Sequence, residues 1–381
     1  MKKRIISALL SAAMIVTCFA ACGKEDQPEV IEQTVDVAVV TETPAADAAV
    51  DPAEFFNQVS SDGKVRSYLT GEWVAEEIGR SRPFALMVEN TKDCLPQYGL
   101  SKAGIIYECP VEGSITRMMA IFDDYTGMDR IGNVRSSRPY FVYFASEYEA
   151  FYGHAGGNPA AFDLIDQGLV ENLNGLDGDL TPSMYFRAKD SSAPHNLYCT
   201  SDGIAAGIKA RNYDTNYSSS YEPKHLFCDE SNPNMITDGS NCEVVKLYYY
   251  YNHPYWVYNS EDGLYYRYEF GKAQIDANTG EQISAKNIIL QNAEWFSYTG
   301  SDYIGFFLND YTGNGLYFTN GRACEITWTK GDENSTTRYY DSNGEELKIN
   351  VGQTWVQLCQ AYCVEDNEYY ETVAEFEKAS K

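Results

Sequence analysis

The sequence predicts an α+β protein, in which an N-terminal mixed α/β domain is followed by a mostly antiparallel β domain, after a signal peptide and a disordered acidic tether. Between about residues 82 and 213, short apolar runs alternate with capped helical patterns, which is typical of α/β structure. From about residue 242 onward, the segments are rich in Tyr, Ile and Val and are interrupted by the hairpin pairs Asn320-Gly321 and Asn343-Gly344. The length of 381 residues suffices for about two domains of ~100–200 residues each.

The first domain is predicted to contain four strands and three helices. The strands are the apolar runs at residues 83–88, 104–109, 117–122 and 150–153. The helices are expected where a capping side chain precedes a helical pattern: Ser136 or Ser137 before Arg138-Pro139, Asn158 before Pro159, and Thr200 or Ser201. Such a side chain accepts an otherwise unpaired N–H at a helix start, and Pro at the first position has no N–H to leave unpaired.

The second domain is predicted to be built of strands joined by turns. Its Tyr-, Ile- and Val-rich segments are residues 244–258, 263–270, 287–291, 315–328 and 337–349. Aromatic and β-branched residues in such runs favour a pleated, half-buried surface, and the Asn-Gly pairs between them favour type I′ hairpin turns.

Composition sets the predicted boundaries. Residues 24–60 hold nine acidic residues against one lysine and show no helical or strand period, which predicts a self-repelling, disordered segment. The stretch from 229 to 241 is rich in Asp, Asn, Ser and Pro, which indicates an interdomain linker. The predicted organisation is a lipoprotein signal peptide at 1–21, a lipidated N-terminus and disordered acidic linker at 22–75, an N-terminal domain at 76–228, a linker at 229–241, a C-terminal β-rich domain at 242–363 and an acidic tail at 364–381.

The N-terminus predicts export. Three cations at positions 2–4 precede an uncharged run over 5–21, and two alanines then precede Cys22. This pattern fits a bacterial lipoprotein signal, although Phe19 stands where an aliphatic residue is usual. Simple cleavage and an uncleaved anchor are the alternatives. The expected partner is the lipid bilayer, entered by a diacylglycerol anchor with palmitate on Cys22, and the expected location is the outer face of the bacterial cell membrane.

The overall charge excludes one class of partner. The chain has 29 Lys and Arg against 55 Asp and Glu, a formal net charge of −26. Because binding to a phosphate backbone needs clustered cations, no nucleic-acid partner is expected. Hydrophobic residues make up 44% of the chain, which suffices for folded cores.

Eight cysteines follow the signal region. They are Cys94, Cys109, Cys199, Cys228, Cys242, Cys324, Cys359 and Cys363. Export allows disulfides, and Cys228 with Cys242 could close the predicted linker. Cys109 and Cys324 lie in strand-like runs and are expected to be buried thiols. The spacings contain no C-x-x-C pair, so neither a metal nor a cofactor is expected.

A cationic stretch runs from Gly132 to Tyr140. Arg135, Ser136, Ser137 and Arg138 surround a predicted helix start, and together they suit a phosphate or a carboxylate. The alternative is structural: both arginines pair with nearby acids, such as Glu147 or Asp123, and the serines only cap the helix.

Two histidines lie in polar loops. His154 opens a loop that contains Gly156 and Gly157, which allow the backbone to approach a ligand closely. His195 and Asn196 end a second polar loop before the next predicted helix. The remaining histidines, His225 and His253, lie beside prolines and are expected to be structural.

A third stretch, from residue 108 to 117, carries paired acids. Glu108 and Glu112 follow a predicted strand, with Arg117 close behind. Paired carboxylates can perform acid–base work on a glycosidic bond. The alternative is a salt bridge between Glu112 and Arg117 that fixes a turn.

At these stretches the chain resembles the YerB-like family of bacterial lipoproteins, whose two domains carry only designations of unknown function. The resemblance rests on residues 82–90, 95–122, 131–165, 192–198, 276–291, 316–330 and 338–358, in the family's order. Ser137 departs from the pattern, because family members commonly carry alanine there. The resemblance implies a lipoprotein with an α+β first domain and a β-rich second domain, and it leaves the activity open.

Three functions are consistent with these residues. The first is binding of an anionic envelope ligand, such as a wall glycopolymer phosphate or a peptidoglycan carboxylate, by the Arg, His and Gly residues. The second is an envelope hydrolase or transferase that uses Glu108, Glu112, His154 and His195 as acid–base groups. The third is a structural interaction module, in which Tyr248–Tyr251 and Trp256 face a sugar or an envelope protein.

Overall fold

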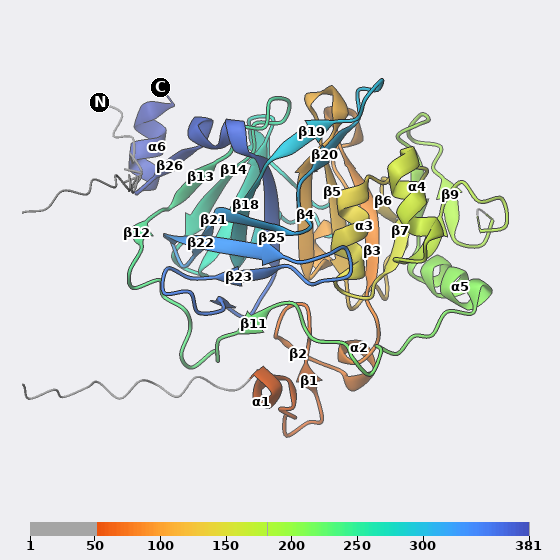
Figure 1. The fold of residues 1–381 in the computed structure, drawn as a ribbon, viewed down its shortest axis with the longest axis horizontal. Helices are drawn as coiled ribbons and strands as arrows, with labels where there is room; N and C mark the ends of the chain where they lie inside the picture. The colour runs from red at the N-terminus through yellow and green to blue at the C-terminus, as the bar shows by residue number, and fades with distance from the viewer. Residues whose placement is uncertain (1–51, 181, 381) are drawn as a thin grey trace, which may run out of the picture. The chain divides into compact units, whose positions relative to one another are not determined.

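The computed structural model describes residues 52–180 and 182–380, and its fold is drawn in Figure 1. The predicted signal peptide, the lipidated Cys22 and the acidic stretch up to residue 51 lie outside the described residues. Within the described residues, no helix combines the length and the apolar character that a membrane crossing requires.

One sheet of eleven strands runs through the middle of the molecule (Figure 1). Its strands follow the order β12-β22-β21-β18-β25-β4-β5-β3-β7-β8, and β23 pairs with β22. The first half of the chain supplies β3 (Phe84–Asn90), β4 (Ile105–Pro110), β5 (Thr116–Phe122), β7 (Phe151–His154) and β8 (Glu171–Asn174). The second half supplies β12 (Ser240–Asn241), β18 (Asn287–Ala293), β21 (Tyr311–Thr319), β22 (Arg322–Lys330), β23 (Arg338–Tyr340) and β25 (Thr354–Gln360).

The two predicted domains share this sheet. β25 lies parallel between β18 and β4, and Gln357 pairs with Glu108 across the joint. The predicted linker at 229–241 is not a structural break, because β11 (Leu226–Phe227) pairs with β24 (Lys348–Ile349) and β12 pairs with β22. The described residues likewise form one compact unit. The predicted α+β class is confirmed, with an interface between its halves that is made of backbone hydrogen bonds.

A second sheet covers part of one face of the central sheet. Its strands are β16 (Lys272–Ala273), β15 (Leu264–Glu269), β14 (Tyr255–Asn259), β13 (Val244–Lys246) and β26 (Glu368–Tyr370), with β17 (Ser284–Ala285) on β15. Trp256 of this sheet packs against Trp355 of β25, and the two ring centroids are 4.9 Å apart. Side chains alternate along each strand, so apolar side chains point to both faces of the central sheet. The sheet therefore separates two hydrophobic cores, one on each face.

Helices cover the remaining surfaces. α3 (Pro139–Ser146) and α4 (Pro159–Asp166) pack on the other face of the central sheet, and in Figure 1 α3 lies in front of β3 and β5 with α4 beside it, toward β7. α5 (Ser201–Arg211) packs on the same face as the second sheet. Asn158 caps α4 as predicted, with its Oδ1 accepting from the Ala161 N–H at 3.0 Å, and Thr200 caps α5.

The predicted serine cap of α3 is wrong. The residue before Pro139 is Arg138, and no side chain caps this helix. Ser137 Oγ instead lies 2.7 Å from the hydroxyl of Tyr152, and Ser136 Oγ donates to the Ala155 carbonyl. Neither serine hydroxyl bonds to the first turn of α3, because this part of the chain runs alongside β7 before it enters the helix.

Folded structure begins well before residue 76. α1 (Pro52–Phe56), β1 (Val65–Arg66), β2 (Trp73–Val74) and α2 (Glu76–Gly79) lie within the segment predicted as a disordered linker and just after it. Phe55 and Phe56 are buried against Phe227, and Arg66 stacks on Trp73 at 3.9 Å. The prediction of disorder over 22–75 is therefore wrong from residue 52. The prediction rested on the acidic composition of this segment and took no account of its buried aromatic residues.

The acidic tail at 364–381 is likewise ordered over most of its length. β26 pairs with β13, and α6 (Val373–Ala379) follows it, capped by Thr372. η4 (Ala361–Asp366) connects β25 to this segment. The tail thus extends the second sheet.

Two small sheets frame one end of the central sheet. β6 (Ile131–Gly132), β10 (Leu197–Cys199) and β9 (Tyr185–Arg187) form a three-stranded sheet. β19 (Trp295–Ser297) and β20 (Ile304–Phe306) form a separate hairpin. Two short 3₁₀ helices, η1 (Lys92–Cys94) and η2 (Leu100–Lys102), follow β3, and a third, η3 (Glu112–Ser114), joins β4 to β5.

All eight cysteines of the described residues are free thiols. The disulfide that could close the predicted linker between Cys228 and Cys242 is therefore not formed. Cys109 is buried, as expected, and burial raises the pKa of its thiol. Cys324 is only half-buried, on β22.

Candidate functional site

Three stretches that the sequence singles out meet at one end of the central sheet. The backbone N–H of Ala155 donates to the Arg135 carbonyl at 2.9 Å, and that of Ser137 donates to the Gly156 carbonyl at 2.8 Å. Arg117, at the start of β5, donates through Nη1 to the Ser136 carbonyl at 2.9 Å. Segments far apart in sequence are thus held together by main-chain atoms.

Three guanidinium groups and two carboxylates lie here, and we call them the arginine cluster: Arg117, Arg135, Arg138, Glu89 and Glu112. Arg138 donates through Nε to Glu112 Oε2 at 2.9 Å, and Arg117 Nη2 lies 3.7 Å from Glu112 Oε1. Arg135 Nη2 lies 3.0 Å from Glu89 Oε1. Three positive charges face two negative ones, so the cluster carries a net positive charge in a strongly acidic chain.

Burial and neighbouring charges shift the titration of Arg117 and Glu112. Burial, together with the charges of Arg138 and Arg135, lowers the pKa of Arg117 to about 10. Burial alone would raise the pKa of Glu112, but the hydrogen bonds and charges of Arg138 and Arg117 outweigh it and lower that pKa. Both ions therefore stay charged at neutral pH.

The cluster is open on one side. The side chains of Arg135 and Glu112 are 20% and 23% exposed, whereas Arg138 is almost fully buried. Nε of Arg135 is buried and has no hydrogen-bond partner among the described residues. The structural alternative drawn from the sequence therefore holds in part: the arginines do pair with acids, but with Glu89 and Glu112 instead of Glu147 and Asp123.

Glu89 was not singled out from the sequence. It is buried, and its Oε1 accepts from His195 Nδ1 at 2.7 Å and from Thr91 Oγ1 at 2.9 Å, while Oε2 has no partner among the described residues. The available signal was a charged residue near the end of an otherwise apolar strand, FALMVEN, every residue of which is buried.

Glu89 orients His195. The side chain of His195 is 28% exposed, and no partner for its Nε2 exists in the described part of the chain. Asn196 fixes the loop, since its Oδ1 accepts from Arg187 at 2.9 Å and its Nδ2 donates to the Ala188 carbonyl at 3.2 Å. Of the four acid–base candidates, His195 is the one with both a carboxylate partner and a free nitrogen.

His154 does not line this surface. It is fully buried; Nδ1 lies 2.8 Å from the Gly156 carbonyl and Nε2 lies 2.8 Å from Asn172 Oδ1. Burial lowers the pKa of its imidazole. The residue holds the loop of Gly156 and Gly157, in which Gly156 adopts a positive φ of 76°. The role predicted for it in acid–base chemistry is not compatible with this burial.

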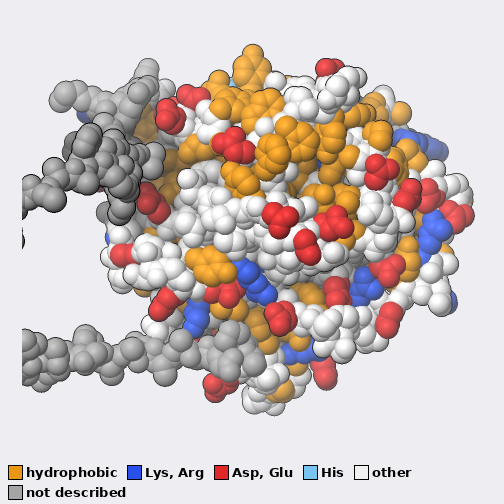
Figure 2. Space-filling view, viewed as in Figure 1, with side chains coloured by type: hydrophobic (Ala, Val, Ile, Leu, Met, Phe, Trp, Pro, Cys, Tyr) orange, Lys and Arg blue, Asp and Glu red, His pale blue; other side chains and the backbone are white. Residues whose placement is uncertain are grey.

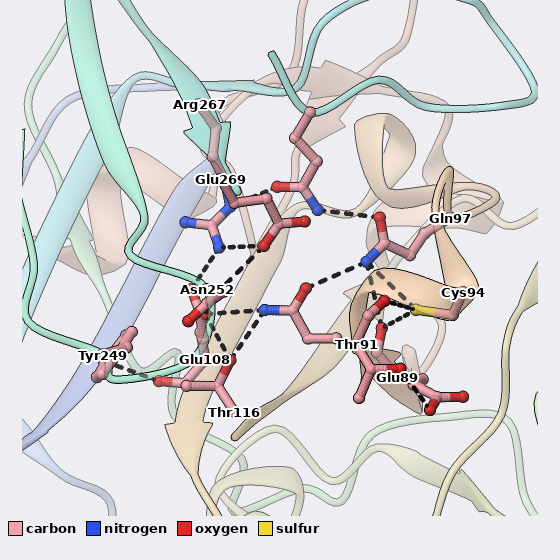
Figure 3. A network of polar contacts seen from close by, with 12 residues as sticks. Glu89, Thr91, Cys94, Gln97, Glu108, Thr116, Tyr249, Asn252, Arg267 and Glu269 are labelled. Carbon is pink, nitrogen blue, oxygen red and sulfur yellow. Dashed lines mark hydrogen bonds and ion pairs between the residues drawn. The ribbon is translucent and has the colours of Figure 1, made fainter. Parts of the chain in front are cut away.

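Glu108 lies on the other face of the sheet, in the buried network of Figure 3. Its carboxylate accepts from Asn90 at 3.0 Å and Asn252 at 2.8 Å, and it pairs with Arg267 at 2.8 Å. Glu108 and Glu112 share no partner, so the predicted pairing of these two carboxylates does not occur.

A second carboxylate joins that network. Glu269 lies 3.3 Å from the same guanidinium of Arg267. Burial, only partly offset by Arg267 and reinforced by the charge of Glu108, raises the pKa of Glu269 to about 7. The network is thus a closed structural centre between the halves of the chain.

One aromatic residue of the β19–β20 hairpin reaches the arginine cluster. The ring of Tyr303 lies 4.9 Å from the Arg138 guanidinium carbon. Of the aromatic face predicted from the sequence, Trp256 and Tyr249 are buried, while Tyr248, Tyr250 and Tyr251 are exposed. In residues 52–180 and 182–380, no three His, Cys, Asp or Glu side chains are grouped to hold a metal ion.

Comparisons with known proteins address the family. The N-terminal and C-terminal models of a "Protein of unknown function (DUF3048)" match residues 69–214 and 245–356. The Bacillus subtilis protein named "Putative lipoprotein YerB" is 28% identical over 300 residues, which cover 77% of this chain and 86% of the relative. The crystal structure of YerB superposes with a TM-score of 0.69 and covers 77% of this chain and 96% of that one. The chain is similar to YerB and belongs to this two-domain DUF3048 family of unknown function.

Proposed function

We propose that this protein is a lipoprotein, anchored through Cys22 at the outer face of the bacterial cell membrane, that binds an anionic group of a cell-envelope polymer at the arginine cluster. The candidate groups are a wall glycopolymer phosphate and a peptidoglycan carboxylate. The lipoprotein name of the Bacillus subtilis relative supports the anchor. The single observation that carries the ligand class is the excess of guanidinium over carboxylate charge at an open surface.

The arginine side chains are preorganised, because protein contacts hold them in place without a bound anion. Arg138 and Arg117 are held by Glu112 and by the Ser136 and Ser137 carbonyls, so little side-chain freedom remains to be lost on binding. The uncapped N-terminus of α3 adds its positive dipole end at the same place. Arg135, partly exposed and with an unpaired Nε, is the group that would turn toward the ligand.

The test is binding of the chain without its lipid to phosphate and carboxylate probes. Arg135→Ala is expected to lower the affinity for poly(glycerol phosphate) or for muropeptides by about tenfold, as loss of one charge-assisted contact implies. Arg211→Ala is the matched control, since Arg211 is a 28% exposed, salt-bridged arginine on α5. Equal retention of Arg135→Ala and wild type on both probes would refute the proposal.

A second candidate function rests on the contact between Glu89 and His195. A carboxylate at Nδ1 fixes the tautomer that leaves Nε2 free to accept a proton from water or a hydroxyl group, as an envelope hydrolase or transferase requires. His195→Gln should then abolish the release of soluble fragments from isolated cell walls while anion binding persists. Absence of any release by the wild-type chain would remove this candidate.

A further inference from the structure

A band of partly exposed aromatic side chains lies on and beside the β19–β20 hairpin, next to the arginine cluster. We call it the aromatic hairpin surface, and it comprises Trp295, Phe296, Tyr298, Tyr303, Phe307 and Tyr362. Figure 2 shows hydrophobic side chains gathered over the β19–β20 hairpin. Phe307 is 50% exposed and Tyr362 63%, and the others are half-buried. Contiguous apolar exposure of this kind marks an interaction site.

The rings form two groups, which together we call the platform, and within each group neighbouring ring planes are inclined by 47° to 61°. Phe296 lies with centroids 4.9 Å from Phe307 and 5.1 Å from Tyr298, and Trp295 lies 5.8 Å from Tyr362. Phe296 pairs across the hairpin with Gly305, and its ring covers the space that a Cβ at Gly305 would need. The glycine therefore allows the ring to lie flat across the two strands.

The hairpin is firmly seated. Its inward residues Ile304 and Phe306 are buried, and Phe306 meets Tyr140, near the start of α3, at 5.1 Å. The same hairpin carries Tyr303 over Arg138. The hairpin, from the second half of the chain, thus contacts the arginine cluster, from the first half, through Tyr303 and Arg138.

We propose that the aromatic hairpin surface stacks sugar rings, and that the ligand of this protein is an acidic glycan whose anionic substituent sits at the arginine cluster. The proposal rests on the proposed anion-binding function and narrows it to polymers that contain sugar rings. A sugar has apolar C–H faces and a hydroxyl edge, and aromatic rings offer a matching flat apolar face.

The border of the platform favours a glycan over a protein partner. Glu294, Ser297, Thr299, Ser301 and Asp302 are all exposed and alternate with the rings. The buried centres of protein–protein interfaces are depleted in such residues, whereas these side chains can hydrogen-bond the hydroxyl groups of a sugar. The guanidinium groups of Arg138, beside Tyr303, and of the partly exposed Arg135 supply the complement to an acidic substituent.

The experiment is a calorimetric titration of the chain without its lipid against three probes. They are a hyaluronan hexasaccharide, with sugar rings and carboxylates, a neutral chitohexaose, and poly(glycerol phosphate), with phosphates and no rings. The wild type is expected to bind the acidic glycan at least about tenfold more tightly than either of the others, because that probe alone engages both parts of the surface.

Two variants separate the parts. Phe307→Ala should weaken both sugar probes by about fivefold to tenfold and leave poly(glycerol phosphate) unchanged, since stacking on one aromatic ring contributes about that much. Arg135→Ala should weaken the two anionic probes alone. Tyr250→Ala is the control, because Tyr250 is 69% exposed but lies outside the platform. Unchanged thermal unfolding of each variant shows that the fold is retained.

The outcomes distinguish the two proposals. If poly(glycerol phosphate) binds as tightly as the acidic glycan and Phe307→Ala has no effect, the glycan inference is overturned while anion binding stands. If neither anionic probe binds, the proposed function itself fails. If Phe307→Ala instead abolishes self-association of the chain, measured by sedimentation, the surface is a protein interface and the inference is also overturned.

Discussion

The two faces of the central sheet carry two clusters of the same residue types with opposite character. Glu89 and Asn90 are neighbours on β3, as Thr116 and Arg117 are on β5, and in each pair one side chain enters the arginine cluster and the other enters the buried network (Figure 3). In the network, Glu108 and Glu269 share one guanidinium, Arg267, and all are buried. In the arginine cluster, three guanidinium groups exceed two carboxylates at an open surface.

The difference indicates which of the two clusters can bind a ligand. A buried excess of carboxylate is relieved by a proton, because no ion can enter, which is why the pKa of Glu269 rises to about 7. An exposed excess of guanidinium can be relieved by an anion from outside. Four predictions test this contrast, from the largest expected effect to the smallest.

Removing the shared guanidinium should have the largest effect. Arg267→Met leaves Glu108 and Glu269 buried without their cation, and a loss of about 3–5 kcal/mol in the free energy of unfolding is expected. Arg135→Ala in the arginine cluster should cost less, on the order of 1–2 kcal/mol, because Arg135 is partly exposed and the buried Glu89 keeps its contacts with His195 and Thr91. Urea unfolding of both variants measures the contrast. If the two losses were equal, the arginine cluster would be as structural as the network.

The protonation of Glu269 should make stability depend on pH. Its pKa is raised from 4.5 in the unfolded chain to about 7 in the folded one, so its contribution is complete below about pH 4.5 and is lost as the pH rises through 7. The loss is on the order of 3 kcal/mol. Glu269→Gln should remove this slope in urea titrations between pH 5 and 8, and a slope that persists in the variant would assign it to another group.

The arginine cluster should respond to salt, and the buried network should not. Affinity for poly(glycerol phosphate) should fall as NaCl rises, and Arg135→Ala should reduce the logarithmic slope by about one, by analogy with phosphate contacts to nucleic acids. The difference in unfolding free energy between the wild type and Arg267→Met should change little over the same salt range, because buried pairs are poorly screened. A slope that is unchanged in the variant would place the bound phosphate away from Arg135.

The smallest effect concerns Gly305. An added methyl group in Gly305→Ala would push the Phe296 ring off the hairpin without touching the arginine cluster. Stability should change by less than about 1 kcal/mol, because the ring is at the surface. Glycan affinity should fall a few-fold, while anion affinity stays constant. Calorimetry with the hexasaccharide and with poly(glycerol phosphate) measures both, and a loss shared by the two probes would show that the hairpin also shapes the arginine cluster.

Local signals in the sequence predicted much of the first half. Apolar runs at 83–88, 104–109 and 117–122 correspond to β3, β4 and β5, and the Asn158 cap marks the start of α4. Each of these signals is a property of a few neighbouring residues, so it could be found without knowing the fold.

What sequence reasoning missed depends on contacts between distant residues. Tyr303 meets Arg138 only because β25 pairs with β4 and brings the halves together. Glu89 and His195 lie far apart in the sequence, so their contact can be recognised only from the folded position of the His195 loop. The folded structure of residues 52–75 was missed because the segment is acidic and because Phe55 and Phe56 pack on Phe227, which lies far along the chain.

The position of β25 has a consequence for how the chain folds during and after its synthesis. Residues 354–360 arrive late in synthesis, yet they lie between β18 and β4 at the centre of the sheet. Until they are in place, two sheet edges stay open, and such edges recruit other chains. A chain cut short before residue 354 is therefore expected to aggregate or to be degraded, so that only the full-length product would persist as folded protein.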